Sequence, residues 1–290
     1  MLHYSFSVSP ATQQLLVGLL ILWSSLLFGG FAYGKLRRSY LARHIPALLP
    51  ASPISIPREM RLGSSLCLTV AAWIWLESAR LTSFETFALW FALGASLSCL
   101  GDFIVILVRA EHGPFVGLLC FITAHVAYIS GMISPITHTM RMAPAASEQP
   151  LAFLIPYLAI VWIWILVGMA VWYLRVYRPG DQDAINATPL IYAVILSVTA
   201  GLATGLAVQS SNFWLIAAGA ILLWFSELVI APQLLHDESL ADEQADRPRR
   251  LPSFGDLIWL TYGPGQMLVV FGLALAMMLY SHPFMYGGLY

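Results

Sequence analysis

The chain has 290 residues, of which 59% are hydrophobic and only 10% are charged, and its mean hydropathy is +0.77. These values exclude an ordinary soluble globular domain and indicate an integral membrane protein. The formal net charge of −1 gives no reason to expect a nucleic-acid partner.

Eight apolar runs are long enough to cross a membrane, for which about 20 mostly apolar residues are needed. In chain order they cover residues 11–34, 62–78, 84–108, 114–134, 151–175, 189–209, 211–234 and 256–280. The runs are continuous and lack an alternation of period two, so they predict helices rather than the strands of a barrel. We therefore expect one all-α transmembrane domain over residues 1–290, in the cell membrane if the source is bacterial.

Basic residues are unevenly distributed between the predicted loops. Of the 14 lysines and arginines, all but Arg80 and Arg141 lie in or next to loops that follow an odd-numbered span. Loops rich in positive charge stay in the cytoplasm, so this skew predicts that both termini are non-cytoplasmic. The proline-rich, basic loop 35–61 is expected to be an extended segment near anionic headgroups, and the polar loop 235–255 to be a solvated linker.

Two stretches of the chain echo each other, and each carries an acid inside an apolar run. They read GASLSCLGDFIVILV at 94–108 and GAILLWFSELVIAPQ at 219–233. Both begin with Gly-Ala and place a carboxylate eight residues later, Asp102 in the first and Glu227 in the second. The two stretches are four spans apart, and this even offset predicts a parallel four-plus-four internal repeat.

The two acids are expected at the same depth. Asp102 lies six residues before the predicted end of its span and Glu227 seven before the end of its own, which puts both about 9–11 Å from the cytoplasmic end. A charged group inside a membrane helix is costly unless it has a partner or faces water. We expect both carboxylates to face one water-accessible cavity, where one protonated and one ionised acid suit acid–base chemistry.

Further polar side chains are predicted to reach this cavity and to orient the acids or a substrate. They are His125 and Tyr128 of the fourth span, Tyr262 and Gln266 of the eighth, and Ser98 and Ser226 next to the acids. His125 and Tyr128 are three residues apart and Tyr262 and Gln266 four, so each of these two pairs shares a helix face. No second histidine has the spacing of a metal site, and we expect neither a metal nor a cofactor.

Simpler interpretations stay open for these residues. A single buried acid is often a hydrogen-bonded link between helices. His125 alone is more often a satisfied core histidine than a catalyst, and the tyrosines can be ordinary packing residues. No nucleophile elbow, phosphate loop or dinucleotide fingerprint is present in the sequence.

These motifs resemble the two signatures of the YhhN-type lysoplasmalogenase family. The first signature is matched by GDFIVIL at 101–107 and GPFVGLLCFITAHVAY at 113–128, and the second by GAILLWFSELVIA at 219–231 and TYGPGQMLV at 261–269. The matched positions are Asp102, His125, Tyr128, Ser226, Tyr262 and Gln266, with Phe115 and Gly117 matched more loosely. The chain departs from the pattern at Glu227, where the family usually has aspartate, in the proline of TYGPGQ, and in the absence of a Lys-Pro pair after the first span.

The resemblance implies a membrane hydrolase that cleaves the vinyl-ether bond of lysoplasmalogens and releases a fatty aldehyde and a glycerophospho-headgroup. Such a bond hydrolyses when its β-carbon is protonated and water captures the resulting oxocarbenium ion. One of Asp102 and Glu227 would donate the proton, while the other would stabilise the cation or guide the water, as paired carboxylates do at glycosidic bonds. Arg109, at the rim, would meet the substrate phosphate.

Two other classes of function fit the same sequence. Parallel repeats with buried acids also describe a proton-coupled transporter of lipids or other small molecules. A non-catalytic lipid-binding homologue is the third possibility, which the departure at Glu227 favours. The oligomeric state is not determined by the sequence.

Overall fold

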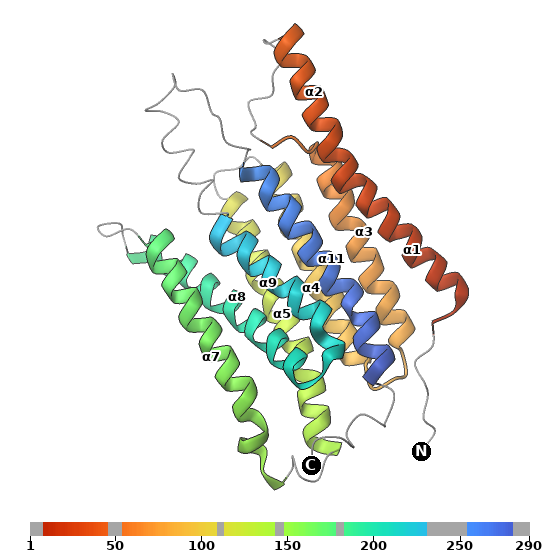
Figure 1. The fold of residues 1–290 in the computed structure, drawn as a ribbon, viewed down its shortest axis with the longest axis vertical. Coiled ribbons are helices and arrows are strands. Elements are labelled where there is room, and N and C mark those ends of the chain that lie inside the picture. Colours follow the sequence, from red (N-terminus) through yellow and green to blue (C-terminus); the bar gives the residue numbers. More distant parts are fainter. Residues whose placement is uncertain are drawn as a thin grey trace.

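A computed structural model of the chain describes residues 8–45, 54–108, 113–142, 148–177, 183–230 and 254–280. All regular elements in these ranges are helical, and they form a bundle of long helices (Figure 1). The elements are α1 (Pro10–Ser24), η1 (Ser25–Gly29), α2 (Gly30–His44), α3 (Arg58–Ala79), α4 (Glu85–Leu107), α5 (Gly113–Met142), α7 (Pro150–Arg175), α8 (Asp183–Gln209), η3 (Ser211–Phe213), α9 (Trp214–Trp224), η4 (Phe225–Ile230) and α11 (Phe254–Tyr280).

Eight helical segments in the described part of the chain are long and apolar enough to cross a membrane. The predicted all-α class and the predicted eight spans are therefore confirmed, and the chain is a multi-pass membrane protein. The orientation of the termini and the internal repeat stay predictions of the sequence.

Several helix ends differ from the prediction, and the two largest differences are extensions at the ends of the first and fourth spans. The first span continues through α2 to His44, so residues 35–44 are helical rather than extended. Good helix formers fill this segment, and Pro46 follows at a position that disfavours further helix. The fourth span also continues, to Met142, past a proline that the helix contains at Pro135. Residues 46–53 of the first predicted loop and residues 235–253 of the second lie outside the described residues.

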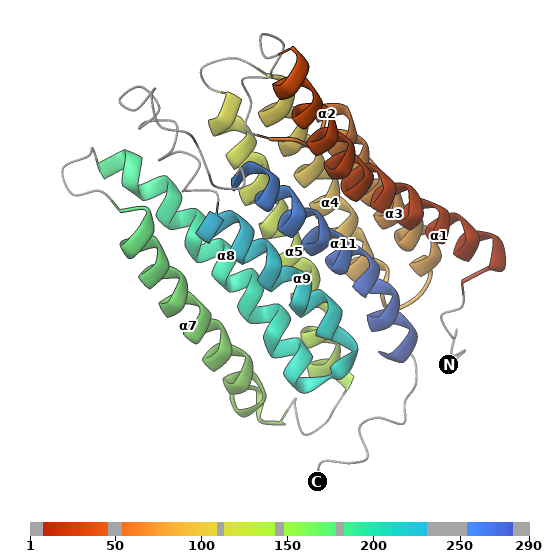
Figure 2. The ribbon, with the colours of Figure 1, turned by 45° about the horizontal axis from the view of Figure 1, so that its top comes forward.

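The bundle has two edges and a centre. Helices α1, α2 and α3 lie along one edge and α7 along the opposite one, with α4, α5, α9 and α11 between them (Figures 1 and 2). Helix α4 packs along α5, α7 along α8, and α9 along α11. Helix α7 is the least covered span and exposes large apolar side chains such as Leu151, Trp162 and Leu166. Such a surface fits a helix that faces lipid.

The glycines of the two echoed stretches serve close helix contacts. A Cβ atom at Gly94 on α4 would lie 2.5 Å from the ring of Tyr128 on α5. A Cβ atom at Gly219 on α9 would lie 2.6 Å from the carbonyl oxygen of Gly265 and 2.8 Å from the backbone nitrogen of Val269, both on α11. Gly94 thus lets α5 pack directly against α4, and Gly219 lets α11 pack directly against α9.

The carboxylate of Asp256 connects α11, α2 and the segment before α3 at one end of the bundle. Asp256 of α11 is 3.0 Å from the ammonium group of Lys35 on α2. The same carboxylate accepts hydrogen bonds from the backbone N–H groups of Ser55 at 2.5 Å and Ile56 at 3.4 Å. Asp256 is 3% exposed, so these bonds fix the segment that leads into α3.

Substitution of Gly219 by alanine should destabilise the protein by about 1–3 kcal/mol, because the new methyl group would meet rigid backbone atoms of α11 and push the helices apart. Thermal unfolding in detergent measures the effect. Gly18→Ala in α1 is the matched control, since a Cβ atom there has no neighbour within 4 Å. Equal unfolding temperatures for both variants would contradict the close contact between α9 and α11.

Candidate active site

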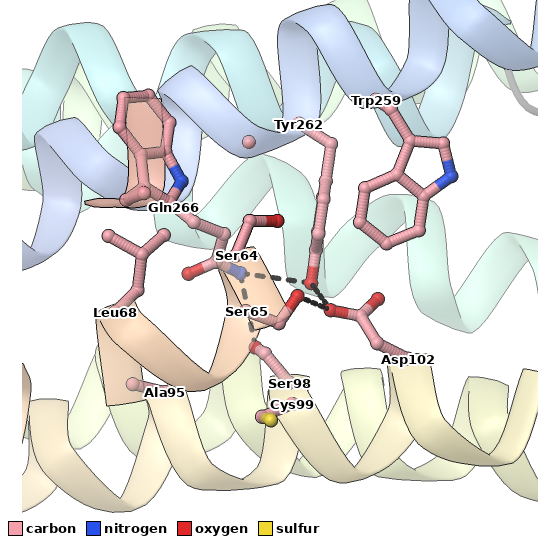
Figure 3. A pocket seen from close by; sticks show the side chains of 12 residues that line it. Ser64, Ser65, Leu68, Ala95, Ser98, Cys99, Asp102, Trp259, Tyr262 and Gln266 are labelled. Atoms are coloured by element: carbon pink, nitrogen blue, oxygen red, sulfur yellow. Dashed lines mark hydrogen bonds between the residues drawn. The ribbon is translucent and has the colours of Figure 1, made fainter. Parts of the chain in front are cut away.

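Asp102 lies on α4, where 4% of its surface is exposed. Its Oδ2 atom accepts hydrogen bonds from the hydroxyl group of Ser65 on α3 and from that of Tyr262 on α11, the latter at 3.3 Å. Oδ1 makes no hydrogen bond within the described ranges and lies on the side of Trp259 in Figure 3. Because both donors occupy Oδ2, a proton on this carboxyl group would sit on Oδ1.

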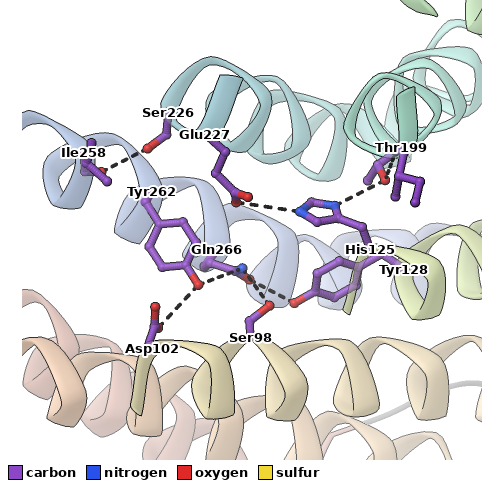
Figure 4. Close-up of polar contacts among 11 residues, drawn as sticks. Ser98, Asp102, His125, Tyr128, Thr199, Ser226, Glu227, Ile258, Tyr262 and Gln266 are labelled. Atoms are coloured by element: carbon purple, nitrogen blue, oxygen red, sulfur yellow. Dashed lines mark hydrogen bonds and ion pairs between the residues drawn. The ribbon is translucent and has the colours of Figure 1, made fainter. Parts of the chain in front are cut away.

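Gln266 of α11 connects the side chains around this acid (Figure 4). Its Nε2 atom donates to the hydroxyl groups of Ser98 at 3.1 Å and Tyr262 at 3.4 Å, and its Oε1 atom accepts from the hydroxyl of Tyr128 at 2.9 Å. The acceptor role of Oε1 fixes the orientation of the amide. Tyr262 accepts from the amide and donates to Asp102, so the network has a direction and ends at the carboxylate.

A pocket lies directly beside this network (Figure 3). Its lining residues are Trp23, Ser64, Ser65, Leu68, Ala95, Ser98, Cys99, Asp102, Trp259, Tyr262, Gly263 and Gln266. The space left free in it is about 10 Å³, which is close to what one water molecule needs. The pocket therefore joins a carboxylate, several hydroxyl groups and an apolar wall around a water-sized space.

Glu227 lies in the π-helical turn η4, and 11% of its side chain is exposed. Its Oε1 atom is 3.7 Å from Nε2 of His125 on α5, and neither carboxylate oxygen has a hydrogen-bond partner among the described residues. Single π-helical turns are often found at functional sites. A buried carboxylate whose oxygens lack hydrogen bonds is free to take a water or a substrate group.

His125 contacts polar groups through both of its ring nitrogens. Nδ1 of this imidazole is 3.2 Å from the hydroxyl oxygen of Thr199 on α8, and that hydroxyl donates its own proton to the carbonyl of Ile195 at 2.9 Å. The hydroxyl is thus placed to accept from Nδ1–H of the imidazole, and Nε2, the nitrogen that faces Glu227, forms an ion pair with that carboxylate when it is protonated as well.

The two acids lie in separate polar clusters, and the expectation of one shared cavity stays a prediction. Glu227 does not line the pocket that contains Asp102. Figure 4 shows Tyr262 and Gln266 between the two carboxylates, because α11 presents its polar face there. The clusters are connected through the rings of His125 and Tyr128, whose centroids are 5.9 Å apart, and through the bond from Tyr128 to Gln266.

The remaining candidates have different positions. Ser98 lines the pocket and accepts a hydrogen bond from Gln266. Ser226 is fully buried and donates to the carbonyl of Ile258 at 3.2 Å, so it holds η4 against α11 and takes no part in either acid's hydrogen bonds. Arg109 lies outside the described residues.

Three residues that the sequence reasoning did not select stand next to the acid. Ser65 donates to Asp102, Trp259 lines the pocket, and the guanidinium of Arg61 lies over the Trp259 ring, 5.2 Å from its centroid. In the sequence, Arg61 falls at the end of the predicted basic loop 35–61. The spacing of Arg61 and Ser65, one turn apart at the start of a short span, is a signal that could have identified them.

Metal-ligating side chains do not gather in the parts of the chain that the structure covers. No group of three histidine, cysteine, aspartate or glutamate side chains lies close enough there to hold an ion. The pair of His125 and Glu227 by itself provides fewer ligands than a structural or catalytic zinc site uses.

Comparison with known proteins identifies the family. The family model described as the YhhN family matches residues 60–273. This range contains both acids and every pocket residue except Trp23 of α1. Searches of the curated proteins and of the solved structures gave no match.

Replacement of Gln266 by leucine should lower the free energy of unfolding by about 1–3 kcal/mol, because Tyr128 and Ser98 would lose a buried hydrogen-bond partner. Thermal unfolding in detergent provides the measurement. Gln209→Leu, at an exposed position at the end of α8, is the control and should change little. If both variants unfold like the parent protein, Gln266 does not organise the site.

Proposed function

Because the chain belongs to the YhhN family, the family of lysoplasmalogenases, we propose that it hydrolyses the vinyl-ether bond of a lysoplasmalogen within the membrane. Family membership and the membrane-helical fold together fit a membrane hydrolase. The observation that carries the specific proposal is Asp102, a buried acid whose Oδ2 holds two donors while its Oδ1 is available to the pocket.

The reaction consumes one water molecule. A proton is added to the β-carbon of the alkenyl chain, which leaves an oxocarbenium ion at the ether-bearing carbon. Water adds to that carbon and loses a proton, and the hemiacetal so formed breaks its bond to the glycerol oxygen, which takes up the proton of the hemiacetal hydroxyl. The products are a fatty aldehyde and a glycerophospho alcohol. Catalysis therefore needs a positioned acid, a negative charge near the cation, and a base for the water.

Asp102 supplies the acid in this proposal. Hydrogen bonds from Ser65 and Tyr262 to Oδ2 leave Oδ1 to carry the proton to carbon. The same two donors stabilise the carboxylate that remains after transfer. This carboxylate then accepts the proton of the attacking water, which restores the acid, in the way that one carboxyl group serves first as acid and then as base in retaining glycosidases.

Glu227 supplies negative charge in the second cluster. Its oxygens lack hydrogen bonds to described residues, and His125 is positioned 3.7 Å away by its bond to Thr199. The carboxylate lies on the far side of Tyr262 and Gln266 from Asp102, so its part is to stabilise the oxocarbenium ion at a distance rather than to share the proton of Asp102.

The lipid has to enter from the apolar side of the pocket. The free space of about 10 Å³ suits the hydrolytic water but no alkenyl chain. The chain would therefore lie between helices and the bilayer, and the side chains at the pocket mouth would move apart when it binds. Trp23 and Leu68 form part of the apolar wall along which an alkenyl chain can lie.

Asp102→Asn should keep the protein folded and reduce aldehyde release by at least about 10³-fold, because the amide cannot donate a proton to carbon. Mass spectrometry of products from purified protein and lysoplasmalogen measures this, with ordinary ester lysophospholipid as the second substrate. Glu77→Gln, at an exposed acid of α3, is the control. Full activity of the asparagine variant would remove Asp102 from the reaction, and bound lipid without turnover in the parent protein would indicate a lipid-binding homologue.

Glu227→Gln should lower kcat by about 10–100-fold with a smaller change in KM, because neutralising the charge destabilises the transition state more than the bound lipid. Steady-state kinetics with lysoplasmalogen separate the two parameters. An unchanged kcat would show that the cluster of His125 and Glu227 has only a structural role.

A further inference from the structure

Arg61 is a cation without a hydrogen-bonded acceptor beside the pocket. Its guanidinium makes no hydrogen bond or salt bridge with any residue in the described part of the chain, and its Nε atom is buried without a partner. The side chain is partly buried, yet three acids lie near enough to interact with it electrostatically, namely Asp102, Asp256 and Glu59. A buried guanidinium N–H without an acceptor needs an explanation.

Each of the three acids is already engaged by another group. Asp256 pairs with Lys35 at 3.0 Å, Glu59 with Arg58 at 3.4 Å, and Asp102 accepts from Ser65 and Tyr262. Arg61 is thus attracted to the site by its charge but bound to none of these carboxylates. Its donors are left for an acceptor that does not belong to the described chain.

A cation–π contact with Trp259 holds the guanidinium beside the pocket. The guanidinium carbon lies 5.2 Å from the centroid of the indole, and Trp259 itself lines the pocket. A guanidinium over an aromatic face is attracted by the ring and still has N–H groups that can bind two oxygens of a phosphate. The arrangement therefore places a side chain that can bind phosphate next to the pocket.

The position of Arg61 along α3 matches the dimensions of a lysolipid. Ser65, which donates to Asp102, follows Arg61 by one helical turn on the same face, a rise of about 6 Å. In a lysoplasmalogen, five covalent bonds separate the vinyl-ether oxygen from phosphorus, which spans about 6 Å when extended. Arg61 is also close enough to Asp102 to interact with it electrostatically, so a lipid with its ether group at Asp102 can extend its phosphate toward the guanidinium.

We propose that Arg61 binds the phosphodiester of the lipid substrate and makes the site specific for phosphate-bearing ether lipids over neutral alkenylglycerols. This inference rests on the function proposed above, because it assigns Asp102 to the ether group. It gives Arg61 the role that the sequence assigned to Arg109.

Binding of uncleavable lipids tests the assignment without any turnover. The parent protein in detergent should bind a 1-alkyl lysophosphatidylcholine more tightly than a 1-alkylglycerol of the same chain length. Arg61→Gln should weaken binding of the phospholipid about 10–100-fold and leave binding of the alkylglycerol unchanged. Arg61→Lys should give an intermediate affinity, because an ammonium group keeps the charge but loses the fork.

Arg58→Gln is the matched control, since Arg58 lies on the same turn of α3, is half-exposed and pairs with Glu59. It should bind both lipids like the parent protein. The assignment would be overturned if the Arg61→Gln variant lost binding of both lipids or of neither lipid. Equal affinity of the parent protein for the two lipids would also overturn it, and that measurement does not depend on the folding of a variant.

The outcome for lipid binding is separate from the outcome for hydrolysis. Arg61-dependent binding without aldehyde release would keep the phosphate site and refute the hydrolase. Aldehyde release with equal kcat/KM for a lysoplasmalogen and for an alkenylglycerol would keep the hydrolase and refute the phosphate site.

Discussion

A buried amide in a membrane protein has to find partners inside the protein, because the surrounding hydrocarbon offers none. Gln266, a residue of α11, meets this requirement. It donates to Ser98 of α4 and accepts from Tyr128 of α5, so its amide links three helices. Rotation of any of these helices about its axis would leave at least one buried polar atom without a partner. The position of Asp102 follows from this constraint, since Tyr262 lies one turn before Gln266 and donates to the acid.

Close approach of the helices makes the short hydrogen-bonded connections possible. Gly94 leaves room for the ring of Tyr128, and Gly219 lets α9 lie against the backbone of α11. Without a hydrophobic driving force between helices in lipid, small residues and interhelical hydrogen bonds provide much of the association. The residues that allow helix packing and the residues that form the site are therefore parts of the same contacts.

Separation of the two acids shapes the chemistry that the site can perform. Carboxylates in direct contact share a proton and titrate as a unit. Here Tyr262 and Gln266 lie between Asp102 and Glu227, and each acid has its own neighbours. A site of this kind can keep a proton on one acid and a charge near the other, and Arg61 lies over Trp259, which lines the pocket of Asp102.

Length, composition and apolar runs were enough to determine the eight spans, because about 20 apolar residues define a membrane helix whatever it packs against. The scarcity of polar residues in such runs also picked out Asp102, His125, Tyr128, Tyr262 and Gln266, which the structure brings into two connected clusters. Sequence periodicity gives depth and helix face but not the rotation of one helix relative to another. For that reason only the tertiary structure decided that Glu227 faces His125 rather than Asp102, and that Ser65 and Arg61 of α3 stand beside the acid.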